Sequence, residues 1–150
     1  MDRRELLRAS VIAGLALTAK GAAAESNKPK PGAGVLTVPE YLHRAALLLD
    51  ETKRSQDWVG QHPWDLGLAA MAYELAELRN QLAVKIAAPP QAKQAHMHLL
   101  LALENTAASF DAALRGDEKK AAQRMAAARA EEQTLYLALE AAKLKMPTVK

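Results

Sequence analysis

The sequence predicts an all-α protein that folds as an up-down-up-down four-helix bundle. Alanine and leucine supply 56 of the 150 residues, and aromatic residues only 4%, a composition that favours helices over sheets. Apolar residues recur every three or four positions in four successive segments, which is the period of an amphipathic helix. Short connections join the segments, so neighbouring helices are expected to run antiparallel.

Residues 1–24 are predicted to be a cleaved export signal. A basic start is followed by a mildly apolar run over residues 9–19 and by an Ala-x-Ala site that ends at Ala24, the three regions of such a signal. The apolar run is too short to span a bilayer. The alternative is an amphipathic N-terminal helix that stays in the mature protein.

Paired arginines, Arg3 and Arg4, make this segment resemble a twin-arginine translocation signal, whose pattern is Ser/Thr-Arg-Arg-x-Phe-Leu-Lys. Asp2, Leu6 and Arg8 stand where that pattern has Ser/Thr, Phe and Lys. The resemblance implies a periplasmic or secreted protein exported by the twin-arginine route, with the general secretory route as the alternative.

The charge of the mature chain argues against nucleic-acid binding. The whole chain has 20 basic and 17 acidic residues, of which residues 1–24 hold four and two. The remaining charges are nearly balanced, whereas nucleic-acid binding needs a basic face. The chain has no cysteine, which excludes disulfides, thiolate metal sites and a cysteine nucleophile.

Residues 25–36 have little to bury and are predicted to be a flexible leader to a bundle domain over residues 37–150. The first helix is expected from Thr37 to about Gln56 and would be the shortest of the four. Thr37 and Glu40 have the spacing of a capping box, and Pro39 is tolerated in a first turn.

The second helix is expected from about Trp64 to Ile86, before Pro89. Its apolar stripe is the most regular in the chain and is expected to face the core. The stripe consists of Trp64, Leu68, Met71, Leu75, Leu78, Leu82 and Ile86.

The third helix is expected from about Gln91 to Arg115, and the fourth from about Glu118 to Lys145. Between them, Gly116 is expected to adopt a left-handed conformation and Asp117 to cap the fourth helix.

Two polar residues fall on predicted core stripes, His96 on the third helix and Glu132 on the fourth. A buried carboxylate needs a partner. The helix heights place Glu132 near His96 and near Lys53, so a polar core layer is one hypothesis, with fixing the register as its simplest use. The alternative is that Glu132 lies at the rim of the bundle.

Catalytic, metal and haem signatures are missing. The sequence has no His-x-x-x-His pair, no phosphate-binding loop and no nucleophile elbow. Its one Glu-x-x-His pair, Glu40 and His43, falls short of the two such pairs on different helices that di-iron bundles use. Cytochrome b562-type bundles use a Met in the first helix and a His in the last, and neither is present here. We therefore expect no enzyme activity, no resident metal and no cofactor.

Trp58 and Trp64 flank the first helix connection in a chain that is poor in aromatic residues. They are expected to plug one end of the bundle or to anchor a partner, because exposed tryptophan is a common interface anchor. The sequence thus predicts a non-enzymatic binding or accessory module of the cell envelope, with an envelope protein or a second copy as partner. The alternative is a periplasmic carrier of a metal, haem or small ligand in the bundle core.

Overall fold

The computed structural model of the protein describes residues 34–149. The predicted signal peptide over residues 1–24 and most of the predicted leader lie outside the described residues.

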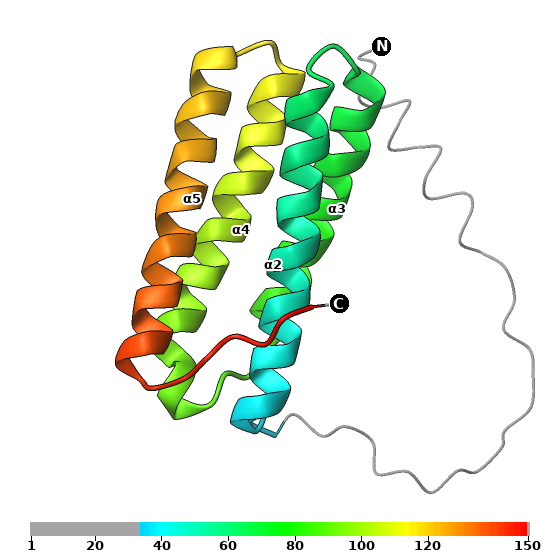
Figure 1. Ribbon diagram of the computed structural model, residues 1–150. Coiled ribbons are helices and arrows are strands. Elements are labelled where there is room, and N and C mark those ends of the chain that lie inside the picture. The colour runs from blue at the N-terminus through cyan, green and yellow to red at the C-terminus, as the bar shows by residue number, and fades with distance from the viewer. Residues whose placement is uncertain (1–33, 150) are drawn as a thin grey trace, which may run out of the picture. The chain divides into compact units, whose positions relative to one another are not determined.

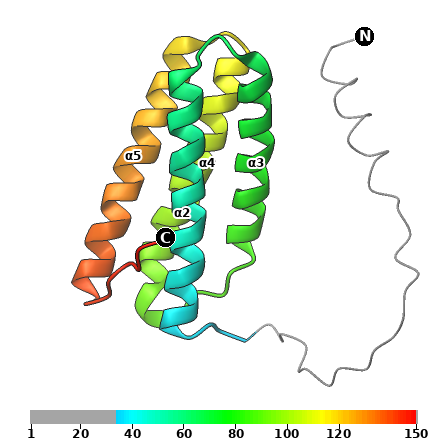
Figure 2. The same ribbon diagram turned by 45° about the vertical axis from the view of Figure 1, so that its right-hand side comes forward.

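Four α-helices and one short 3-10 turn make up the described chain, which has no strand. Each helix runs antiparallel to the one before it (Figure 1), and a second view shows the same up-down-up-down order (Figure 2). The all-α four-helix bundle is therefore confirmed. The elements are α2 (Val38–Gln61), α3 (Leu66–Val84), η1 (Pro90–Ala92), α4 (Lys93–Leu114) and α5 (Glu118–Ala141).

Helix α2 begins as predicted and ends later than predicted. The Oγ1 of Thr37 accepts the backbone N–H of Glu40, and the Glu40 carboxylate accepts the backbone N–H of Thr37, which completes the capping box. The helix continues to Gln61, so it has 24 residues and is not the shortest. Gly60 does not end the helix. It lies within the last turn of α2 and has no left-handed conformation there.

The connection between α4 and α5 forms as predicted. Gly116 has a φ of 76°, and the Asp117 side chain accepts the backbone N–H of Lys120. Helix α5 ends at Ala141, before the predicted end, and Lys143 adopts a positive φ of 57° just beyond it.

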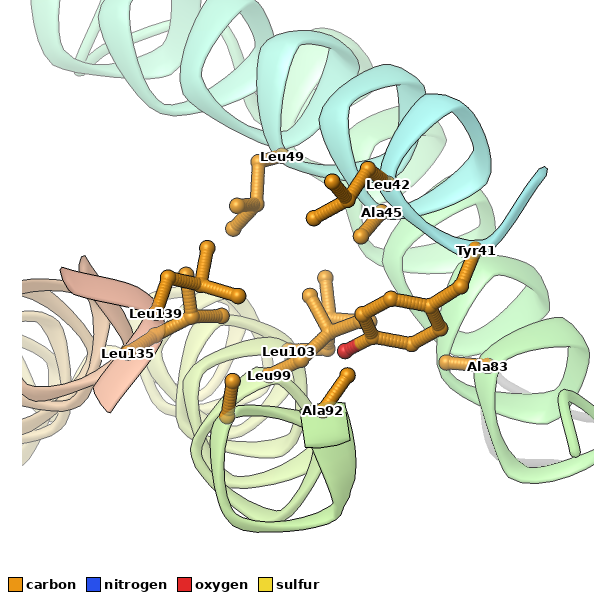
Figure 3. Packing of buried hydrophobic residues seen from close by; sticks show 11 residues of the cluster. Tyr41, Leu42, Ala45, Leu49, Ala83, Ala92, Leu99, Leu103, Leu135 and Leu139 are labelled. Carbon is orange, nitrogen blue, oxygen red and sulfur yellow. The ribbon is translucent and has the colours of Figure 1, made fainter. Parts of the chain in front are cut away.

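The main core cluster lies where α2, α4 and α5 meet, and α4 packs along both α3 and α5. Tyr41 on α2 points inward toward leucines of α4 (Figure 3). Among the buried residues of this cluster are Tyr41, Leu42, Ala45, Leu49, Leu99, Leu103, Leu135 and Leu139.

Helix α3 packs on the bundle through alanine. Its buried residues are Ala69, Ala72, Ala76 and Ala83. Two of them, Ala72 and Ala76, form a second core cluster with Ala107 and Phe110 of α4. Small side chains let the two helices approach closely, so little large apolar surface of α3 is used inside the bundle.

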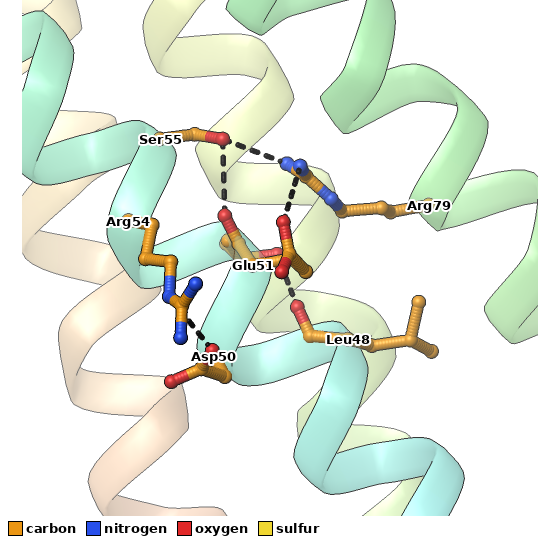
Figure 4. A network of polar contacts seen from close by, with 7 residues as sticks. Leu48, Asp50, Glu51, Arg54, Ser55 and Arg79 are labelled. Carbon is orange, nitrogen blue, oxygen red and sulfur yellow. Dashed lines mark hydrogen bonds and ion pairs between the residues drawn. The ribbon is translucent and has the colours of Figure 1, made fainter. Parts of the chain in front are cut away.

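A polar network also ties α3 to α2 (Figure 4). The Arg79 guanidinium donates to Ser55 Oγ at 3.0 Å and lies 3.9 Å from the Glu51 carboxylate. Its side chain is only 11% exposed, and this burial lowers the pKa of Arg79 while Glu51 opposes the shift. The Arg79 guanidinium is thus already bound by groups of its own chain.

The prediction that the apolar stripe of the second helix faces the core is wrong for five of its seven residues. Of the other two, Leu68 is half-buried and Ile86 packs against the main core cluster. Trp64, Met71, Leu75, Leu78 and Leu82 are exposed, whereas alanines occupy the buried face. Both faces are apolar with a helical period, and the chain packs the one whose side chains are smaller.

Candidate functional site: the outward face of α3

Six large apolar side chains of α3 are exposed. Leu66 and Val84 are its first and last residues, and the other four form a row along one side of the helix. Met71 is 66%, Leu75 44%, Leu78 52% and Leu82 49% exposed. We call these four residues the α3 face. Contiguous exposed apolar patches on soluble proteins mark interaction sites more often than isolated apolar residues do.

The geometry of α3 keeps this face apart from the bundle core. Successive residues of an α-helix turn by about 100°, so Leu78 points well away from Ala76. The alanines at positions 69, 76 and 83 repeat every seven residues and hold one side of α3 against the bundle. The residues of the α3 face also repeat every seven residues, but they lie on a different side of the helix.

Polar residues follow one edge of the α3 face. Glu74 and Gln81 are exposed and seven residues apart, so they share one edge of the helix. The exposed Lys85 follows at the C-cap of α3, close to the same edge. The other edge carries Arg79, whose guanidinium is bound to Ser55 on α2. One edge is therefore free for an external contact, and the other is occupied by the bundle itself.

An aromatic corner lies at the N-terminal end of α3. The His62 ring stacks on Trp58 with ring centroids 5.4 Å apart, and it meets Trp64 edge to face at 6.2 Å. The Nδ1 of His62 is 2.9 Å from the carbonyl oxygen of Trp58. Trp58 is 59% and Trp64 76% exposed, so neither indole is enclosed by the bundle.

His96 lies in a different environment from the predicted polar layer. Its ring meets Tyr41 edge to face, with centroids 5.6 Å apart. Within residues 34–149, neither its buried Nδ1 nor the buried Oη of Tyr41 has a hydrogen-bond partner. Burial lowers the pKa of His96 and raises the pKa of Tyr41 to about 12.

Glu132 is half-buried and lines a groove of about 210 Å³ between α2, α5 and the C-terminal residues. Lys53 and Tyr136 line the same groove. Among the described residues, no hydrogen bond or ion pair joins Glu132 to His96 or to Lys53. The two residues of the hypothesised polar layer thus have different neighbours, His96 beside Tyr41 and Glu132 beside the groove.

A polar pair that the sequence analysis missed joins α4 to α5. His98 Nδ1 is 2.7 Å from the Glu131 carboxylate. Because α5 folds back along α4 after the turn at Gly116, positions 98 and 131 lie at similar heights in the bundle. A histidine at one position and a carboxylate at the other are the signal in the sequence that could have predicted this pair. Helical spacing alone sets His98 about 200° around α4 from His96, away from the predicted core stripe.

The part of the chain that the structure describes contains no group of three or more His, Asp or Glu residues arranged to hold a metal ion. Between residues 34 and 149, no helix combines the length and the apolar character that crossing a bilayer requires.

Searches of protein-family models, curated proteins and solved structures found no match to the chain.

Proposed function

We propose that the protein is a non-enzymatic, exported binding or accessory module of the cell envelope, and that the α3 face is its docking surface. The observation that carries this proposal is the exposure of Met71, Leu75, Leu78 and Leu82 along one side of a helix that is otherwise packed by alanine. Burying such a row removes apolar area from water, which favours association at about 25 cal/mol per Å² before the costs of binding.

The aromatic corner supports the same proposal. Trp58 and Trp64 are exposed at one end of α3, and tryptophan is enriched among residues that dominate binding energy. The twin-arginine-like segment around Arg3 and Arg4 supports a periplasmic or secreted location.

Site-specific photo-crosslinking in the producing cells tests the docking surface. A photoreactive residue at position 78 is expected to give crosslinked adducts, because Leu78 is at the middle of the α3 face. The matched control carries the same group at position 137, since Leu137 is also an exposed leucine but lies on α5. Equal adduct yields from both positions would contradict the proposed surface.

Export is tested by the fate of the chain when Arg3 and Arg4 are both replaced by lysine. We expect the precursor to accumulate inside the cell, because the twin-arginine route reads the paired arginines. Unchanged release of a processed chain in a cell that lacks that route would assign export to the general secretory pathway.

A carrier of a small ligand in the bundle core is the second candidate function. The observation that favours it is a pair of buried polar atoms on neighbouring rings, His96 Nδ1 and Tyr41 Oη, that have no hydrogen-bond partner among the described residues. Native mass spectrometry and metal analysis of the exported protein test it. Extra mass that is lost in His96→Ala supports a carrier, and a bare chain mass contradicts it.

A further inference from the structure

We infer that the α3 face binds a second copy of this chain, with the two α3 helices antiparallel. This inference rests on the proposed function and names the occupant of its docking surface. The observations that carry it are the spacing of the apolar residues, the order of charges along the free edge of α3, and the commitment of Arg79 to its own bundle.

The spacing of the α3 face suits helix-on-helix packing. Met71, Leu75, Leu78 and Leu82 are separated by four, three and four residues, the alternation found at the contact positions of two-stranded coiled coils. A twofold axis between Leu75 and Leu78 sets Leu75 opposite Leu78 of the second copy. Met71 then lies opposite Leu82, so every residue of the α3 face is covered by another.

The polar edge of one α3 helix is complementary to the same edge of a second α3 helix that runs in the opposite direction. It reads Glu74, Gln81 and Lys85 along the chain, acid first and base last. In an antiparallel pair the same edges of the two helices meet. Glu74 of one copy then meets Gln81 of the other, with the long Lys85 side chain one turn further on. The symmetry forms the Glu74–Gln81 hydrogen-bonding contact twice and sets the Lys85 cation of each copy about 9 Å along the axis from the Glu74 carboxylate of the other.

A parallel pair lacks this complementarity. In a parallel arrangement the edge that carries Glu74 meets the opposite edge of the second copy, where the corresponding residue is Arg79. That guanidinium already donates to Ser55 and faces Glu51 within its own chain. It is also largely buried, so a contact with another copy would require breaking the link between α2 and α3.

Helix α2 extends the same surface. Glu51 and Ser55 lie on the side of α2 next to α3, as their contacts with Arg79 show (Figure 4). Leu47 precedes Glu51 by one turn and is 53% exposed. An antiparallel twofold keeps the α2 helices of both copies on the same side of the α3 pair, so exposed apolar surface of α2 is available to enlarge the interface.

The first experiment measures mass against concentration for the full chain by sedimentation equilibrium. Dimer is expected to form, and Leu78→Glu is expected to weaken it by on the order of tenfold or more, because both copies lose a central contact. Leu137→Glu is the control, because Leu137 is an exposed leucine on α5, and it should leave the dimer intact. Unchanged thermal unfolding of both variants shows that neither substitution acts through the fold.

The second experiment determines the orientation. Because the chain has no cysteine, Glu74→Cys and Gln81→Cys each introduce a single thiol. A mixture of the two variants is expected to form the mixed disulfide faster than either variant forms its own. Faster self-disulfides, or equal rates for all three, overturn the antiparallel arrangement.

Two results separate this inference from the proposed function. A chain that stays monomeric while position 78 crosslinks to a different envelope protein overturns self-association and leaves the docking function standing. A monomeric chain with no crosslinks from position 78 overturns both.

Discussion

Tyr41 and His96 pack edge to face, with ring centroids 5.6 Å apart and ring planes at 74°. Each ring carries a buried polar atom that has no hydrogen-bond partner in the part of the chain that the structure describes. The pair joins α2 to α4 next to the main core cluster. An unpartnered buried polar atom costs free energy relative to its hydrated form in the unfolded chain. The contact is therefore held by the surrounding apolar packing and not by its polar groups.

Removing the Tyr41 hydroxyl is expected to stabilise the protein. Tyr41→Phe keeps the ring and its contact with His96 and eliminates the unpartnered Oη, so the free energy of unfolding should rise by about 1 kcal/mol. Urea denaturation measures the change. Tyr136→Phe is the control, because Tyr136 is partly exposed and its variant should differ from wild type by less than about 0.5 kcal/mol. A loss of stability in Tyr41→Phe would show that the hydroxyl has a partner in solution.

Acid is expected to destabilise the fold through His96. Burial lowers the pKa of His96 below 6.5, so the unfolded chain binds a proton that the folded chain does not bind between the two pKa values. The free energy of unfolding should therefore fall as the pH drops from about 6.5 through the folded pKa, by at most about 1.4 kcal/mol per pH unit for one proton.

Denaturation at several pH values compares wild type with His96→Gln, which cannot titrate. The slope below pH 6.5 should be smaller in His96→Gln. Met97→Gln changes the exposed neighbour on α4 and should keep the wild-type slope. Equal slopes in wild type and His96→Gln would place the acid sensitivity elsewhere.

The start of α2 and the turn between α4 and α5 could be predicted from the sequence because they depend on neighbouring residues. The capping box of Thr37 and Glu40 and the turn at Gly116 are formed by groups a few positions apart, so residue type and spacing suffice. The end of α2 could not be predicted in this way. Gly60 has a helical conformation there, and a glycine near the end of a helix can either continue the helix or end it.

The buried face of α3 could not be predicted in the same way. Leu78 and Ala76 both belong to apolar rows with a helical period, and periodicity does not say which row meets α4. That choice depends on the distance between helices, which the alanines set. The positions of His96 and Glu132 depend likewise on the rotation and height of separate helices, which single-helix spacing does not fix.

Two glycines in different conformations should respond oppositely to alanine. Gly116 has a φ of 76°, where an L-residue is strained, so Gly116→Ala should lower the free energy of unfolding by about 1 kcal/mol. Gly60 lies in α2, and a Cβ there meets nothing within 4 Å. Gly60→Ala should therefore raise stability by about 0.4–1 kcal/mol, mainly by restricting the unfolded chain. Thermal unfolding measures both, and changes of the same sign would contradict the assigned backbone conformations.

Loss of the capping box should destabilise the start of α2. In Thr37→Ala the backbone N–H of Glu40 loses its acceptor and the Glu40 carboxylate loses the Thr37 hydroxyl, so the free energy of unfolding should fall by about 1 kcal/mol. Hydrogen bonds from Thr37 lower the pKa of Glu40, the backbone bond most of all. The stabilisation from this shift is present above pH 4.5 and is lost as the pH falls through the lower pKa of the folded state.

Thr134→Ala is the matched control for the capping box. Thr134 is an exposed threonine inside α5 whose hydroxyl donates to the carbonyl oxygen of Ala130, one turn earlier. Alanine is the better helix former at such a position, so Thr134→Ala should leave stability unchanged or slightly raised. Chemical denaturation at neutral pH compares the two variants. If both lose the same stability, the effect comes from threonine itself and the cap at Thr37 contributes nothing of its own.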